Sequence, residues 1–183
     1  MGAMSMTEVG VYTVEDLYAY REQRDDMTIQ LIEGELVVSP SPAVIHQVVS
    51  GELFAVLRAA CPPELRVLAA PLDVRAGERS MLQPDLIVVP RELRSGGQVE
   101  TPPLLAVEIL TPSSRRTDLV AKPQVMARFG CPHYWVVDPE APAVQALRLV
   151  GGGYVPAAVA EGDDELVVTE PFAVSFRPVD LTR

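Results

Sequence analysis

Three charged residues in the middle of the chain, Asp85, Glu108 and Lys122, are of types that could act together on a phosphate ester. Glu108 lies within Leu104–Leu110, where every other residue is apolar. Burying a carboxylate there is costly unless a cation or hydrogen-bond donors meet it. Asp85 poses the same question at the start of its own apolar run. If both acids point to one face of neighbouring strands, a divalent cation such as Mg²⁺ would relieve their repulsion and could activate water beside a phosphate.

The residue pattern alone also leaves a plainer interpretation open, in which Glu108 pairs with an arginine such as Arg115 and Asp85 caps a turn. Lys122 favours the interpretation as a catalytic site, because it is the only lysine among the fifteen lysines and arginines of the chain. Its compact ammonium has properties that arginine lacks, although a lone surface lysine could also be there by chance. Pro123 disfavours helical geometry in the residue before it. Lys122 is therefore expected at a helix start or kink, with Pro123 as the first helical residue.

The elements that must position these residues predict an α/β (α+β) fold. A helix is expected from Thr13 to about Glu22 and a β-hairpin from Thr28–Ile32 and Glu35–Val38. A long helix capped by Ser41 should end before Pro62. Strands are predicted at Leu65–Val74, Gln83–Val89, Leu104–Leu110 and His133–Val137, a helix from Thr117 or Asp118 to Phe129 with Gly130 as its stop, and short β-runs over Val144–Phe176.

Length and composition predict one domain over residues 11–183, preceded by residues 1–10 as a cloning remnant and disordered start. The net charge of −10 argues against tight non-specific binding to nucleic acid, which depends on a basic surface. No apolar run approaches the roughly 18 residues of a membrane span. The two cysteines lack motif spacing, which favours a reduced, cytoplasmic protein.

Several motifs, taken together, resemble one protein family. They are Leu31-Ile32-Glu33-Gly34-Glu35-Leu36 with Ser39-Pro40 and His46, then Gln83-Pro84-Asp85-Leu86, Val107-Glu108-Ile109-Leu110-Thr111-Pro112-Ser113-Ser114, Asp118 with Lys122, and Pro132-His133-Tyr134-Trp135-Val136-Val137-Asp138-Pro139. This combination resembles the Uma-two family, restriction endonuclease-like proteins of the PD-(D/E)xK superfamily. The similarity spans roughly residues 13 to 176 of this chain.

The resemblance implies a restriction endonuclease-like core, a mixed central sheet flanked by helices, with an N-terminal β-hairpin and a C-terminal β-meander. It implies that Asp85, Glu108 and the backbone carbonyl of Ile109 bind Mg²⁺ or Mn²⁺. Leu110 stands where the superfamily's lysine is expected, and Lys122 matches a lysine that has migrated to the following helix. That lysine would assist the attacking water and stabilise charge on the phosphate. The expected substrate is DNA, and the expected assembly is a homodimer.

Three further residues are candidates for supporting the site. Members of the family commonly carry a glutamate where this chain has Gln30, and an amide binds a divalent cation more weakly than a carboxylate does. Glu33 lies near Gln30 in sequence, and His46 could contact a metal ligand from the long helix. The expected activity is therefore metal-dependent DNA cleavage. The alternative is a catalytically weak or inactive nuclease fold that acts as a binding module.

Overall fold

The computed structural model describes residues 11–24, 27–93 and 96–183, so the expectation for residues 1–10 lies outside the described residues. The helices are α1 (Val14–Arg21), α2 (Val44–Ala60) and α3 (Lys122–Phe129), with a π-helical turn η1 (Thr117–Ala121) and a 3-10 turn η2 (Pro178–Thr182). The strands are β1 (Thr28–Ile32), β2 (Glu35–Ser39), β3 (Leu65–Ala69), β4 (Asp73–Arg75), β5 (Met81–Leu82), β6 (Leu86–Pro90), β7 (Gln98–Val99), β8 (Leu105–Ile109), β9 (His133–Asp138), β10 (Ala143–Val150), β11 (Gly153–Glu161), β12 (Leu166–Val168) and β13 (Val174–Phe176).

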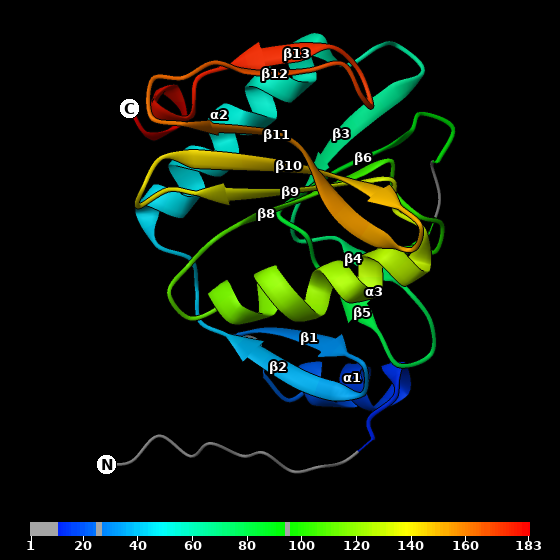
Figure 1. Ribbon diagram of the computed structural model, residues 1–183. Helices are drawn as coiled ribbons and strands as arrows, with labels where there is room; N and C mark the ends of the chain where they lie inside the picture. The colour runs from blue at the N-terminus through cyan, green and yellow to red at the C-terminus, as the bar shows by residue number, and fades with distance from the viewer. Residues whose placement is uncertain (1–10, 25–26, 94–95) are drawn as a thin grey trace.

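A six-stranded mixed sheet forms the centre of the molecule, in the order β11-β10-β9-β8-β6-β3. Strands β8 and β9 run parallel, and the other neighbouring pairs are antiparallel. The parallel pair needs a crossover, which η1 and α3 supply. Helix α2 lies on one side of this sheet and α3 on the other (Figure 1). The mixed central sheet flanked by helices, as expected from the sequence, is confirmed.

Alternation along β8 divides its side chains between the two faces of the sheet. Leu105, Val107 and Ile109 belong to the core that includes the buried side of α2, whereas Ala106 belongs to the core shared with α3. Because successive side chains of a strand point to opposite faces, Glu108 shares the α3 side with Ala106. The continuous apolar run of β8 is therefore explained by a strand that is covered on both faces.

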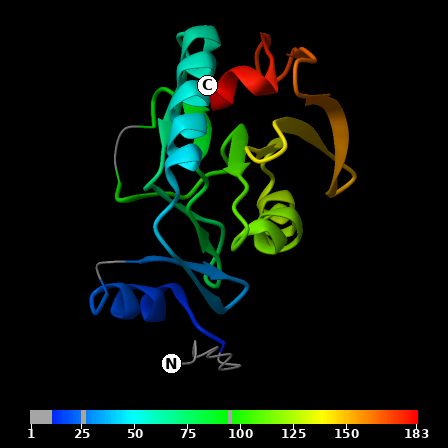
Figure 2. The same ribbon diagram turned by 90° about the vertical axis from the view of Figure 1, so that its left-hand side faces the viewer.

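A smaller five-stranded sheet lies below the central one, in the order β2-β1-β5-β4-β7 (Figures 1 and 2). The expected hairpin is its first part, and its turn residues Glu33 and Gly34 both have positive φ, 54° and 87°. Helix α1 packs beside it and begins with the expected cap, since the Thr13 side chain accepts from the Asp16 N–H and the Asp16 carboxylate accepts from the Thr13 N–H. This sheet brings Thr28 and Gln30 of β1 to the edge of a cleft that Asp85 and Glu108 also line.

Two expectations about boundaries are wrong. Leu65–Val74 is not one strand: β3 ends at Ala69, and the chain crosses to the smaller sheet as β4 after Pro71, which has no N–H to continue the ladder. Helix α2 begins after Ala43, with no side-chain cap, rather than at Ser41. Its buried face is formed by His46, Val49, Leu53 and Leu57, and Val44 is exposed. A buried histidine thus occupies the first inward-facing position of this helix.

The C-terminal part of the chain extends and covers the central sheet. Strands β9, β10 and β11 form an antiparallel meander, and β12 and β13 pair as a separate ribbon. Turn η2 and β13 pack against α2, so the end of the chain lies beside that helix (Figure 2). None of the helices in the described ranges is long and apolar enough to span a membrane.

Candidate active site

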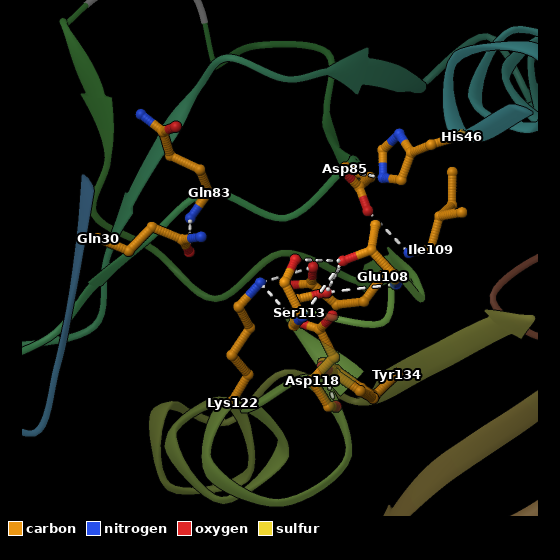
Figure 3. A network of polar contacts seen from close by, with 12 residues as sticks. Gln30, His46, Gln83, Asp85, Glu108, Ile109, Ser113, Asp118, Lys122 and Tyr134 are labelled. Carbon is orange, nitrogen blue, oxygen red and sulfur yellow. Dashed lines mark hydrogen bonds and ion pairs between the residues drawn. The ribbon is translucent and has the colours of Figure 1, made fainter. Parts of the chain in front are cut away.

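Asp85 and Glu108 meet at adjacent ends of β6 and β8. Leu86 pairs with Val107 in the antiparallel register, which places Asp85, immediately before β6, next to Glu108. Asp85 Oδ2 accepts a hydrogen bond from the Ile109 N–H at 2.7 Å, and the Asp85 carbonyl accepts from the Ala70 N–H at 3.0 Å. The sheet therefore fixes both carboxylates, whose positions are shown in Figure 3.

His46 reaches the same point from α2. Its Nε2 lies 3.3 Å from Asp85 Oδ1, and the ring is buried. Burial lowers the pKa of this imidazole, but the hydrogen bond and negative charge of Asp85 outweigh it, so the pKa is raised. His46 thus holds the second oxygen of Asp85 while Ile109 holds the first. The structure thus places His46 beside a candidate metal ligand, and its supporting role stays a prediction.

Lys122 enters from the first turn of α3 and lies between two carboxylates (Figure 3). Its Nζ is 2.8 Å from Glu108 Oε2 and 2.8 Å from Asp118 Oδ1. The exposed fractions of Glu108, Asp118 and Lys122 are 2%, 1% and 4%, so water screens these contacts poorly. Arg115, the alternative partner for Glu108, instead contacts Asp138 at 2.8 Å. The plainer interpretation of Glu108 as an arginine partner is therefore wrong.

Burial governs the ionisation of this cluster. It raises the pKa of the Glu108 carboxyl well above the ordinary value, and the Lys122 ammonium only partly offsets the effect. Burial also acts to lower the pKa of Lys122, but the Glu108 and Asp118 carboxylates outweigh it and raise that pKa. Burial thus makes the Glu108 carboxyl harder to ionise, while the neighbouring carboxylates favour the charged form of Lys122.

Lys122 is the first residue of α3, so the expected helix start is found there, but Pro123 is not the first helical residue because the chain is already helical through η1. The Lys122 N–H donates to the carbonyl of Thr117, five residues earlier, in the π-helical turn η1. In this register the partner of the Asp118 carbonyl would be the nitrogen of Pro123, which carries no hydrogen. The Tyr134 hydroxyl donates to that carbonyl instead, at 2.9 Å. Tyr134, from β9, thus completes the turn that presents Asp118 and Lys122.

Replacing Tyr134 with phenylalanine is expected to lower the free energy of unfolding by about 1 to 3 kcal/mol, because the buried Asp118 carbonyl loses its donor. Urea denaturation measures this effect. Tyr154→Phe is the matched control, since the Tyr154 hydroxyl donates to the Cys131 carbonyl at 2.7 Å in a less buried position. An equal or smaller loss for Tyr134→Phe than for the control would contradict the role assigned to this hydroxyl.

Gln30 and Glu33, the other two candidates, lie in different places. Gln30 is buried on β1 and lines the cleft, and its Oε1 accepts from the Gln83 N–H at 2.8 Å. Glu33 does not line this cleft. It lies in the hairpin turn with a half-exposed side chain and contacts Arg128 at 2.6 Å. The structure therefore does not bring Glu33 to this cleft, because the turn directs its side chain towards Arg128 on α3.

Asp118 belongs to this buried cluster, but the sequence did not indicate it as a site residue. It stands four positions before Lys122, a spacing that places two side chains on one face of a helix. Only the expected boundary of the helix, at Thr117 or Asp118, concealed this relationship, since a residue at a helix start has no fixed face. The spacing was nevertheless present in the motif that linked Asp118 with Lys122.

The cluster opens into a cleft of about 560 Å³, lined by Asp85, Glu108, Ile109, Asp118 and Lys122 among others. Glu108 Oε1 is buried there without a hydrogen-bond partner, and carboxylate oxygens are the ligands that hard divalent cations prefer. Within the described ranges, no group of three or more His, Cys, Asp or Glu side chains is arranged to hold a metal ion. Mg²⁺, however, is commonly bound by one or two carboxylates and completed by water and phosphate oxygens. Asp85 and Glu108 fit that mode of binding.

Comparisons with known proteins agree with this architecture. A search of curated proteins gave no match. Among solved structures, the chain is similar to a protein from Anabaena variabilis described as a "putative nuclease belonging to DUF820". The TM-score is 0.73, and the identity is 22% over 87% of this chain and 91% of that one. The family model Uma2, described as "Putative restriction endonuclease", matches residues 14–182. The chain therefore belongs to the Uma2 family.

Proposed function

We propose that this protein is a metal-dependent endonuclease that hydrolyses phosphodiester bonds in DNA, with Asp85 and Glu108 as ligands of Mg²⁺ or Mn²⁺. The observation that carries the proposal is the unpartnered, buried Oε1 of Glu108, beside Asp85 in an open cleft. Membership of a family described as restriction endonucleases supports nucleic acid as the substrate. A divalent cation bound here would supply Lewis acidity and lower the pKa of a bound water.

The side chains have separate tasks in this reaction. Asp85, held by the Ile109 N–H and His46, and Glu108, held by its strand, present carboxylate oxygens to the cation. Lys122 carries a positive charge at the same point and would stabilise charge that develops on the phosphate. Ile109 lines the cleft, and its carbonyl is the proposed third protein ligand. The sheet holds Asp85 and Glu108 and α3 holds Lys122, so these groups already lie together before a substrate binds.

A catalytically silent binding module is the second candidate. It is favoured by Gln30, a neutral residue whose amide oxygen is already engaged by the Gln83 N–H. It is also favoured by the net charge of −10, since 25 acidic residues outnumber 15 basic ones and would weaken binding to a DNA backbone. A binding module of this kind would bind its partner without a cation and would not cleave DNA. The two candidates therefore differ in metal binding as well as in activity.

The test measures Mn²⁺ binding by calorimetry and cleavage of supercoiled plasmid DNA, for the wild type and Asp85→Asn. We expect Asp85→Asn to lose Mn²⁺ binding and to cleave at least about 100-fold more slowly, because an oxygen ligand loses its charge. The amide oxygen can still accept from the Ile109 N–H, so the fold should persist. Asp73→Asn is the matched control, because Asp73 is a largely buried carboxylate paired with Arg21 and does not line the cleft.

Either of two results would overturn the proposed site. The first is a wild-type protein that neither binds Mn²⁺ nor cleaves DNA, which would favour the binding module. The second is an Asp85→Asn variant that behaves like Asp73→Asn in both assays. Circular dichroism of both variants establishes that any loss comes from the cleft and not from unfolding.

A further inference from the structure

The ammonium of Lys122 contacts two carboxylates, of which only one is a proposed metal ligand. One is Glu108, whose Oε2 lies 2.8 Å from Nζ, and the other is Asp118, whose Oδ1 also lies 2.8 Å from Nζ. Glu108 is a proposed metal ligand and borders Asp85. Asp118 is not adjacent to Asp85 in the sheet, since it comes from η1, four residues before Lys122 on the same helical segment.

The contact between Lys122 and Glu108 opposes metal binding. An ammonium and a divalent cation compete for the same carboxylate, and their like charges repel in a poorly screened cleft. Were Glu108 the sole partner of Lys122, a cation could bind only by leaving a buried ammonium unpaired, which is costly. The cleft contains a second carboxylate that removes this cost.

We propose that Asp118 is a positioning residue that retains the Lys122 ammonium when Glu108 turns to a cation. This inference rests on the proposed function, because it assumes that Glu108 is a metal ligand. Asp118 thereby keeps the positive charge of Lys122 beside the substrate phosphate and frees Glu108 from competition.

The structure holds Asp118 firmly enough for this task. Its side chain is 1% exposed, and its backbone carbonyl is fixed by the Tyr134 hydroxyl at 2.9 Å. Its N–H donates to the Ser114 carbonyl at 2.9 Å. Asp118 lies in η1 and Lys122 begins α3, so their contact is made within one continuous helical stretch and does not pass through Glu108 (Figure 3).

The experiment compares Mn²⁺ binding by calorimetry in the wild type, Asp118→Asn and the double variant Asp118→Asn/Lys122→Met. We expect Asp118→Asn to bind Mn²⁺ about 10- to 100-fold more weakly, the usual loss when a residue supporting a ligand is changed. The double variant should regain wild-type affinity or better, because no ammonium competes for Glu108. It should remain unable to cleave DNA, because Lys122 is absent.

A merely structural role for Asp118 predicts a different pattern. It would lower thermal stability but leave the Mn²⁺ dissociation constant unchanged, and the double variant would gain nothing. Either wild-type affinity in Asp118→Asn or failure of the double variant to recover overturns the inference. The proposed function fails separately, if Asp85→Asn binds Mn²⁺ as the wild type does or if the wild type binds none, and the inference then fails with it.

A second variant covers the case in which Asp118→Asn does not fold. Lys122→Met alone removes the competitor and leaves Asp118 in place, so it should bind Mn²⁺ at least as tightly as the wild type. Its folding can be assisted by the metal itself, which stabilises the state that binds it. Weaker Mn²⁺ binding in Lys122→Met would mean that the ammonium supports the metal site, and would overturn the inference.

Discussion

Replacing Lys122 with methionine is expected to lower the free energy of unfolding by about 3 to 5 kcal/mol and to abolish DNA cleavage. Methionine preserves most of the apolar stem but removes the charge between Glu108 and Asp118. Two buried carboxylates then face each other without a cation. Leaving buried charge uncompensated in this way is what makes the loss of one partner of a buried ion pair strongly destabilising. Urea denaturation in EDTA measures the loss of stability, and plasmid cleavage measures the loss of activity.

Arg128→Met is the matched control for this experiment. Arg128 lies on the same helix and pairs with Glu33, but its side chain is 56% exposed. Exposed ion pairs contribute about 0 to 1 kcal/mol, so this variant should be nearly as stable as the wild type and fully active. A Lys122→Met protein as stable as Arg128→Met would show that the buried cluster does not depend on the ammonium.

Replacing Glu108 with glutamine is expected to abolish cleavage and yet to make the metal-free protein more stable at neutral pH. Burial raises the pKa of Glu108 well above 4.5, its ordinary value. Above the unfolded pKa, the folded state keeps a proton that the unfolded chain has released, so stability falls as pH rises through the folded pKa. Glutamine resembles the protonated acid and removes this penalty. Lys122 retains Asp118 as a partner in the variant.

The measurement is the free energy of unfolding of both proteins in EDTA, from about pH 5 to about pH 8. The advantage of Glu108→Gln should grow with pH, because the two proteins share every other titrating group. Adding Mn²⁺ should stabilise the wild type and leave the variant unchanged, since only a ligand that binds the folded state raises stability. A variant that is less stable at every pH, with a parallel profile, would contradict the raised pKa of Glu108.

The helices and strands around the site could be predicted where the local sequence pattern determines the secondary structure. The apolar run of Leu104–Leu110 indicated a strand covered on both faces, and β8 occupies Leu105–Ile109 in the centre of the sheet. Gly130 was expected to stop the helix after Phe129, and it does so with φ of 94°. The two acids were found because a charged residue beside or within an apolar strand requires a physical explanation, and the sheet places them together.

Features that depend on contacts between residues far apart in the sequence could not be predicted. Strands β5 and β7 have two residues each, so they carry no periodic signal and exist through their neighbours in the smaller sheet. The role of Tyr134 depends on an absent hydrogen at Pro123, eleven positions before it in the chain, and on a π-helical turn that no local pattern announces. Glu33 and Gln30 are three residues apart, but the hairpin turn separates their surroundings entirely.

The packing of η2 against α2 has a consequence for the order in which the chain is made. The helix that carries His46 is covered by Pro178–Thr182 and by β13, which are synthesised after Lys122 and every other residue of the cleft. A nascent chain therefore contains each proposed site residue well before the segments that cover α2 exist. Because domains fold as units during synthesis, the cleft reaches its final form only when these late segments have emerged from the ribosome. If the proposed activity holds, the nascent chain would stay harmless to nearby nucleic acid until these covering segments have been made.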